Sequence, residues 1–192
     1  GIVKSLVKII CISDAIKRKY IEDFKIRDIK KIEVLPSGTS LKIKFSKSFE
    51  TNKLKLGYFG SISSSKGVSL ILKLAQIDCE NNYYIFGGLN SQIMILKKKY
   101  KLKNLYLCSH QNYKQNKKNL SKMDILLIPY TKNVKVAGDV SDISKYTSPL
   151  KLFDYMSAGK LILSSKLEVL GEILHDKQDC IFIKNYLNPF SW

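Results

Sequence analysis

Two stretches of the sequence combine glycine, hydroxyl side chains and lysine in a pattern that suits an anionic ligand. In the first, residues 57–67 (GYFGSISSSKG), Gly60 and Ser61 are followed by three further serines and by Lys66. A glycine lets the backbone approach a ligand closely, and a lysine beside the start of a helix strengthens its positive end. These residues are compatible with a diphosphate site, although by themselves they are more typical of a plain strand-to-helix turn with an exposed lysine. Their spacing matches neither a P-loop nor GxGxxG.

The second stretch, residues 146–160 (YTSPLKLFDYMSAGK), predicts a capped helix with polar side chains near its start. Thr147 or Ser148 can cap the helix, and Pro149 fits its first turn. Lys151 and the first-turn amides could hold phosphate, and Asp154, one turn further, could accept hydrogen bonds from ribose hydroxyls.

An alternative for the same helix is an ordinary amphipathic one. Leu150, Phe153 and Met156 fall on one face at helical spacing, so we expect them to be core. Lys151 and Asp154 would then be a surface pair.

Short apolar runs alternate with amphipathic stretches along the chain. The predicted strands are 5–12, 31–35, 54–59, 83–86, 104–108, 124–129, 161–164 and 180–183. The predicted helices are 14–24, 67–76, 91–100, 114–121, 150–158 and 169–175. From residue 54 onward the strands are continuous apolar runs, which indicates burial on both faces. The pattern predicts an α/β fold with a doubly wound, Rossmann-like parallel sheet, whose ligands bind beyond the carboxyl ends of the strands.

Composition sets limits on the classes of partner. The 192 residues include 33 Lys and Arg against 16 Asp and Glu, a net charge of +17, which favours anionic partners without choosing among them. The four cysteines are scattered with no CxxC pair, so we expect neither a disulfide framework nor a zinc site, and we expect no cofactor.

Several segments together resemble one known family. Residues 60–67, 123–130, 148–159 and 172–174, in this order and spacing, resemble the C-terminal, donor-binding half of GT-B glycosyltransferases, closest to the retaining group 1 (family 4) class. The resemblance extends upstream through residues 11–17 and 34–39, which are similar to the family's interdomain segment. It implies an interdomain remnant over 1–50 and a nucleotide-sugar-binding domain over 51–192, with the family's N-terminal domain missing from this chain.

The resemblance implies roles for individual residues. Lys66 and Lys151 would be catalytic, because they would stabilise the departing diphosphate. The expected substrate-binding residues are Gly60, Ser61, Ser148, Pro149, Leu150 and Asp154. Two positions depart from the family: Ser61 stands where Arg is frequent, and Tyr146 stands where the first glutamate of an E-x7-E pair would fall.

The implied reaction is transfer of a sugar from a nucleotide-sugar donor to a glycan or lipid-linked acceptor, with retention and without a metal. The charge leaves open a basic nucleic-acid-binding module, although no specific nucleic-acid motif is present, and a nucleotide-binding pseudo-enzyme fragment or a GT-B epimerase stays a further alternative. We expect a cytoplasmic location. The lysine-rich run 97–103 is a solvated helix end that could also contact an anionic membrane at the inner face.

Overall fold

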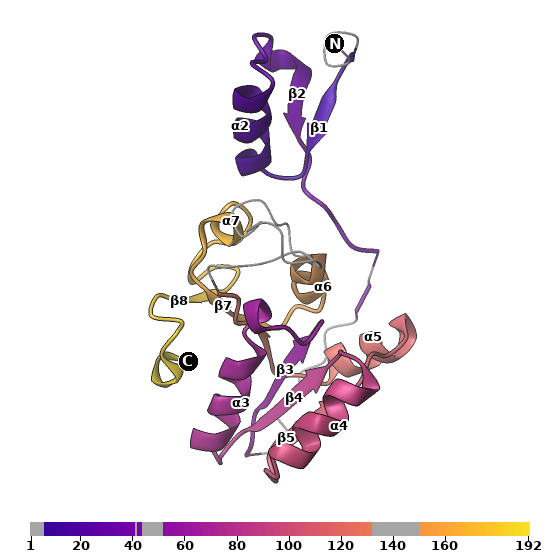
Figure 1. Cartoon of the computed structure of the whole chain (residues 1–192), viewed down its shortest axis with the longest axis vertical. Helices are drawn as coiled ribbons and strands as arrows, with labels where there is room; N and C mark the ends of the chain where they lie inside the picture. The colour runs from indigo at the N-terminus through magenta and orange to yellow at the C-terminus, as the bar shows by residue number, and fades with distance from the viewer. Residues whose placement is uncertain (1–5, 41, 44–51, 132–149) are drawn as a thin grey trace.

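The chain contains two parallel sheets (Figure 1). The computed structural model describes residues 6–40, 42–43, 52–131 and 150–192. A two-stranded sheet near the N-terminus pairs β1 with β2, and a six-stranded sheet has the order β5-β4-β3-β6-β7-β8. Every neighbouring pair in both sheets is parallel, which requires a crossover between successive strands.

The six-stranded sheet confirms the predicted doubly wound α/β fold. Its strands are β3 (Lys55–Phe59), β4 (Asn82–Phe86), β5 (Leu105–Cys108), β6 (Ile125–Ile128), β7 (Leu161–Ser165) and β8 (Ile181–Ile183). Its α-helices are α3 (Val68–Ile77), α4 (Asn90–Lys99), α5 (Tyr113–Ser121), α6 (Leu150–Ser157) and α7 (Glu168–Gly171). Two short 3-10 turns are η2 (Ser64–Lys66) and η3 (Pro189–Ser191).

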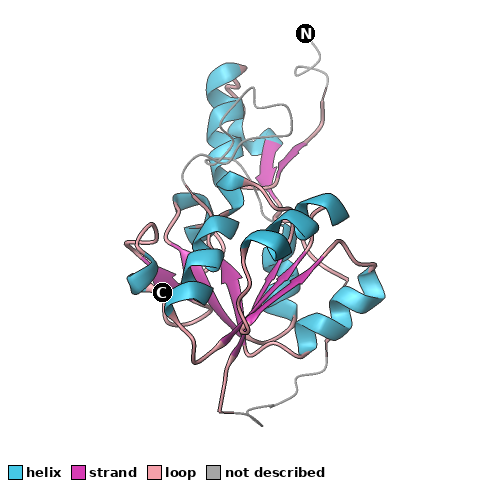
Figure 2. Cartoon of the chain, turned by 60° about the horizontal axis from the view of Figure 1, so that its bottom comes forward, coloured by secondary structure: helices cyan, strands magenta, loops and turns pink. Residues whose placement is uncertain are grey.

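Helices cover both faces of this sheet (Figure 2), and each face has its own apolar core. Tyr58 and Ile85 pack with α3 and with Ile93 of α4, whereas the next residues along the two strands, Phe59 and Phe86, pack with α6. This alternation along strands that are apolar throughout is the physical reason why the sequence shows continuous apolar runs.

The strand order places a crevice at one position in the sheet. The chain moves outward from β3 to β4 and β5, and then returns to place β6 on the other side of β3. Loops leaving β3 and β6 therefore diverge at the carboxyl edge, where open α/β sheets bind ligands.

The predicted core face of α6 is wrong for two of its three residues, and the third, Phe153, is half-buried. Leu150 is 65% exposed and Met156 40% exposed, whereas Leu152 and Tyr155 are completely buried. The helix carries two apolar stripes at the same period, and spacing alone does not tell which of them faces the sheet.

Helix α7 is shorter than the predicted helix 169–175, since it ends at Gly171. Glycine is a poor helix residue, which accounts for the early end. Within the residues that the structure describes, no helix has both the length and the apolar character needed to cross a membrane.

The N-terminal part consists of β1 (Ile9–Cys11), α2 (Asp14–Asp23), the 3-10 turn η1 (Ile29–Lys31) and β2 (Ile32–Val34). The predicted division between residues 50 and 51 falls in 44–51, outside the described residues, and stays a prediction.

Glu172, just after α7, links this part to the larger sheet. Its carboxylate accepts hydrogen bonds from the backbone N–H groups of Asp14 and Ala15, at 3.0 Å each, and lies 3.4 Å from Arg18. These amides are the unpaired donors at the start of α2, where a negative charge is favourable. Glu172 therefore caps a helix that lies far away in the sequence.

We expect Glu172→Ala to loosen the start of α2. Loss of a helix cap costs about 1 kcal/mol, so the amides of Asp14 and Ala15 should exchange with deuterium roughly fivefold faster. The control is Glu168→Ala, because Glu168 is 3.8 Å from Arg18 and holds none of these amides. Equal exchange in the two variants would contradict the cap.

Candidate functional site

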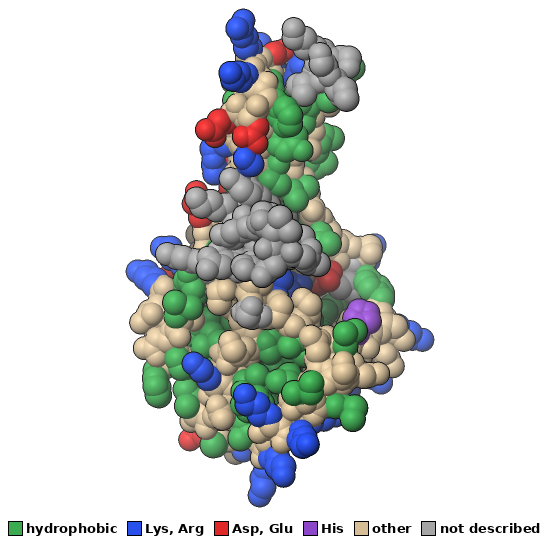
Figure 3. Space-filling model, viewed as in Figure 1, with side chains coloured by type: hydrophobic (Ala, Val, Ile, Leu, Met, Phe, Trp, Pro, Cys, Tyr) green, Lys and Arg blue, Asp and Glu red, His purple; other side chains and the backbone are tan. Residues whose placement is uncertain are grey.

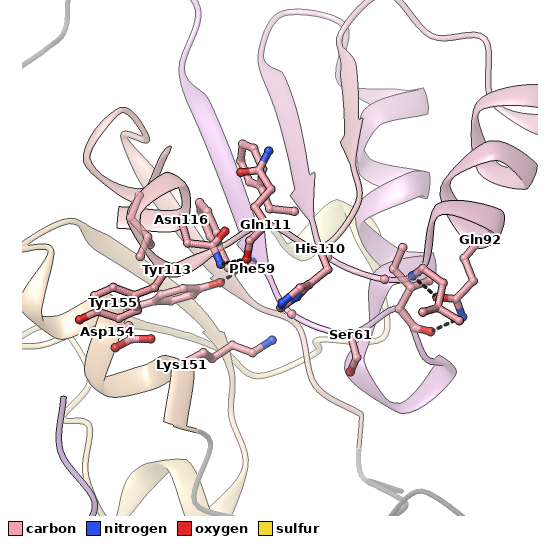
Figure 4. Close-up of a pocket in the computed structure, with 17 residues that line it drawn as sticks. Phe59, Ser61, Gln92, His110, Gln111, Tyr113, Asn116, Lys151, Asp154 and Tyr155 are labelled. Atoms are coloured by element: carbon pink, nitrogen blue, oxygen red, sulfur yellow. Dashed lines mark hydrogen bonds between the residues drawn. The ribbon is translucent and has the colours of Figure 1, made fainter. Parts of the chain in front are cut away.

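A cavity of about 580 Å³ opens at the carboxyl ends of β3, β4 and β5 and is bordered by α6 (Figure 4). It is the position that the strand order predicts for a ligand. The residues that line it are Phe59, Gly60, Ser61, Ile62, Phe86, Gly87, Gly88, Leu89, Gln92, His110, Gln111, Tyr113, Asn116, Leu120, Lys151, Asp154 and Tyr155.

Glycines allow the strand ends to come close at this edge. The Gly60 N–H donates to the Phe86 carbonyl oxygen at 2.9 Å. A Cβ on Gly87 would overlap the carbonyl of Gly60, and a Cβ on Gly60 would overlap the ammonium of Lys151. The absent side chain of Gly60 therefore leaves the space that the Lys151 ammonium occupies.

The Lys151 ammonium is buried and has no hydrogen-bond partner within the part of the chain that the structure describes. Figure 4 shows its side chain extending from α6 into the cavity. Its Nζ lies 3.9 Å from the ring centroid of Tyr58 and 5.0 Å from that of Tyr130, at cation–π distance from both.

Lys66, in the loop that follows β3, contacts Tyr130 as well. Its Nζ lies 4.4 Å from the ring centroid of Tyr130. Two contacts hold the loop there: the Thr131 N–H donates to the Ser65 carbonyl at 3.1 Å, and Gly67, with a φ of 71°, lies against the Pro129 carbonyl, where a Cβ would overlap. The two ammonium groups thus converge on one aromatic ring.

Burial shifts the pKa values of the two lysines and of the two tyrosines beside them. Burial lowers the pKa of Lys151 well below its usual value, and the nearby charge of Lys66 lowers it further. Burial also lowers the pKa of Lys66, and it raises the pKa values of Tyr58 and Tyr130, which keeps both phenols neutral. An anion placed between the lysines would favour the charged form of both, so the site is suited to bind one.

Aromatic residues fix α6 against the sheet. The Tyr155 hydroxyl accepts a hydrogen bond from the Phe59 N–H at 2.8 Å, and Phe59 stacks on Phe86 with centroids 4.6 Å apart. Tyr155 is completely buried, so its position and that of Lys151 one turn before it are fixed together.

Asp154 is contacted by the segment that follows β2. The Thr39 hydroxyl donates to Oδ1 of Asp154, and the Ser40 hydroxyl lies 3.4 Å from the hydroxyl of Tyr113. Both Asp154 and Tyr113 line the cavity, so this N-terminal segment reaches its rim.

The predicted site residues fall into three groups. Four of them, Gly60, Ser61, Lys151 and Asp154, line the cavity. Lys66 lies beside it, over Tyr130. The Leu150 side chain is exposed and lies outside the lining, and Ser148 and Pro149 lie outside the described residues. The proposed roles stay predictions.

Several residues of the site had no predicted role. Tyr58 and Tyr130, which face the ammonium groups, lie in or just after apolar strands, where a tyrosine looks like core. Gln111 and Asn116 form another wall, and the exposed His110 also lines the cavity. Their position after β5 was the available signal, because the loop must open at the carboxyl edge.

Metal-ligating residues do not gather in the described ranges: no three His, Cys, Asp or Glu side chains there could hold a metal ion together.

Comparisons with known proteins show similarity in structure rather than in sequence. No family model and no curated protein matches the sequence. Sucrose-phosphate synthase from Thermosynechococcus elongatus aligns over 95% of this chain and 46% of its own, with a TM-score of 0.69 and 15% identity. HepE from Anabaena in complex with UDP aligns over 92% of this chain and 49% of its own, with a TM-score of 0.63 and 14% identity.

WaaG, a glycosyltransferase involved in lipopolysaccharide biosynthesis, aligns over 92% of this chain and 49% of its own, with a TM-score of 0.62 and 16% identity. The chain spans about half the length of these structures. At such identities the likeness establishes the fold, which is that of one half of a GT-B structure.

We expect Lys151→Met to stabilise the protein without ligand. Methionine keeps the length of the side chain and removes a buried amino group that has no hydrogen-bond partner among the described residues, so the gain should be about 1–2 kcal/mol, or about 2–8 °C in Tm. Thermal unfolding measures it. The control is Lys73→Met on the exposed side of α3, which should change little.

The same gain should depend on pH. The Lys151 pKa is lower in the folded than in the unfolded chain, so the unfolded chain binds more protons and the wild-type protein gains stability as pH rises. The advantage of Lys151→Met should therefore shrink from pH 7 toward about 10, the usual range for lysine. A destabilised variant, or a constant difference, would contradict the buried charge.

Proposed function

We propose that this chain is the donor-binding half of a glycosyltransferase that uses a nucleotide-sugar. The observation that carries the proposal is the convergence of the Lys66 and Lys151 ammonium groups on Tyr130 beside a cavity at the carboxyl edge of the sheet. A diphosphate between the lysines would supply an anionic partner, which the described residues do not give to the Lys151 ammonium.

The proposed roles of the residues give the donor one orientation in the cavity. Its diphosphate would lie at Gly60, Lys66 and Lys151, close to the start of α6, and its ribose would bond to Asp154. The structures of HepE with UDP and with UDP-glucose support a nucleoside diphosphate ligand for this fold, and a starch synthase structure contains ADP, so the base stays a matter for experiment.

The lysines also suggest how the reaction would be promoted. When the bond between the anomeric carbon and the diphosphate oxygen breaks, its electron pair stays with that oxygen, so negative charge develops on the phosphate nearest the sugar. Two cations fixed in a poorly solvated pocket stabilise that charge more strongly as the bond breaks, which lowers the barrier. Retention of configuration and independence from a metal are parts of the proposal that rest on the family resemblance.

We further propose that another domain of the same protein covers the two-stranded sheet. Val7, Ile10 and Leu35 are 85%, 62% and 62% exposed, and isolated two-stranded sheets are marginally stable. In this proposal that domain binds the glycan or lipid-linked acceptor, and the protein works in the cytoplasm at the inner membrane face. Transfer by the complete protein from a labelled nucleotide-sugar would separate an enzyme from a nucleotide-binding pseudo-enzyme.

We expect Lys66→Ala and Lys151→Met each to weaken binding of UDP roughly 10- to 100-fold, because a hydrogen bond to a charged group contributes about 1.5–3 kcal/mol. Uridine, which has no diphosphate, should bind both variants nearly as it binds the wild-type chain. Calorimetry with UDP, ADP, GDP and uridine measures this and also identifies the base.

The control for these variants is Lys73→Ala, which removes one positive charge from an exposed site on α3. If the advantage of UDP over uridine is the same in all three variants as in the wild type, the assignment of Lys66 and Lys151 is wrong.

Asp154→Ala should weaken UDP about fivefold to tenfold, since it removes one acceptor for ribose hydroxyls. The same variant should bind 2′,3′-dideoxyuridine diphosphate as the wild type does, because this ligand has no hydroxyl to lose. Equal weakening of both ligands would mean that Asp154 acts on the shape of the cavity and not on the ribose. The control is therefore the comparison of the two ligands on the same variant.

A further inference from the structure

One half of the domain is strongly and uniformly basic. Between Glu80 and Asp124 the sequence contains nine lysines and neither Asp nor Glu. This region includes β4, α4, β5 and α5, and β5 is the edge strand of the sheet. Its charge is therefore concentrated on one side of the molecule.

Helix α4 adds exposed apolar side chains to this charge. Met94 is 70% exposed and Ile95 66% exposed, whereas Ile93 between the sheet and the helix is buried. Met94 and Ile95 thus lie on the side of α4 that faces away from the core, one turn before Lys97, Lys98 and Lys99.

The apolar surface continues into a groove beside α4. A groove of about 510 Å³ lies between α4 and the end of β5, and Met94, Leu107 and Lys97 are among its lining residues. Figure 3 shows lysine side chains gathered at the lower end of the molecule, where Figure 1 places the C-terminal end of α4, next to hydrophobic ones.

We propose that this surface, formed by Met94, Ile95 and Lys97–Lys99, binds a bilayer that contains anionic phospholipids. Lysines near an anionic surface are attracted to the lipid headgroups, and apolar side chains between them can enter the interface. Nucleic acid would use the lysines alone and would leave Met94 and Ile95 in water, so the exposed pair favours lipid.

The start of α4, and not its lysine-bearing end, lies at the donor cavity. Leu89, immediately before α4, lines the cavity and is 69% exposed. Lys97–Lys99 follow it by eight to ten residues, which is about 12–15 Å along a helix axis, toward the amino ends of the strands. A bilayer on this surface would therefore lie at the end of α4 that points away from the cavity.

The test is sedimentation of the chain with phosphatidylcholine vesicles that contain 0% or 30% phosphatidylglycerol, without nucleotide. We expect binding to the anionic vesicles that falls with salt. Each lysine near such a surface contributes about fivefold in affinity, so Lys97→Gln, Lys98→Gln and Lys99→Gln combined should reduce binding by roughly 100-fold. Met94→Ser combined with Ile95→Ser should reduce it at least tenfold at unchanged charge.

The matched control carries Lys166→Gln, Lys177→Gln and Lys184→Gln, three exposed lysines toward the β8 edge, and should bind the vesicles nearly as the wild type does. Equal losses in the two lysine variants, or full binding by the Met94 and Ile95 variant, would overturn the proposal. So would duplex DNA or RNA binding that exceeds vesicle binding and depends on the same lysines.

The vesicle assay contains no nucleotide, so it can fail while donor binding succeeds, and the reverse. Circular dichroism and UDP calorimetry on the same variants separate loss of membrane binding from loss of folding.

Discussion

Two like charges held against one tyrosine are the interaction on which the site depends. The ammonium groups of Lys66 and Lys151 lie 4.4 and 5.0 Å from the Tyr130 ring centroid, and that of Lys151 has no hydrogen-bond partner in the described residues. Ring faces offset part of the cost of burial, but they do not neutralise a cation. The rest of the domain holds the two lysines in place, and in the proposed function a bound diphosphate would offset the remaining cost of burial.

The supports come from backbone more than from side chains. Gly60 leaves room for the Lys151 ammonium, Gly67 lets the turn before α3 lie against Pro129, and the Tyr155 hydroxyl ties α6 to β3. These contacts lie at the carboxyl edge of the sheet and join β3 and the loop after it to α6 and to the loop after β6. The doubly wound order of the sheet is therefore what brings residues 66 and 151 together across 85 positions of sequence.

Much of the fold was predictable because strands buried on both faces leave continuous apolar runs, as residues 54–59 and 124–129 do. The lysines and Asp154 were predictable as well, since they follow strand ends or begin a helix. The core face of α6 was not predictable, because its two apolar stripes have the same period and only packing against the sheet determines which of them is buried. Nor were the roles of Tyr58, Tyr130 and Glu172, whose partners lie far away in the sequence.

The hydroxyl of Thr39 already occupies one oxygen of Asp154. A carboxylate oxygen can accept two hydrogen bonds, but a sugar hydroxyl that takes the position of the Thr39 hydroxyl would compete with it, and the free energy gained would then be the difference between two similar bonds. Such competition is reciprocal: release of Thr39 favours a ligand at this oxygen, and a ligand at this oxygen favours release of Thr39. Occupancy of the cavity and the position of Thr39 would then be two readouts of one equilibrium.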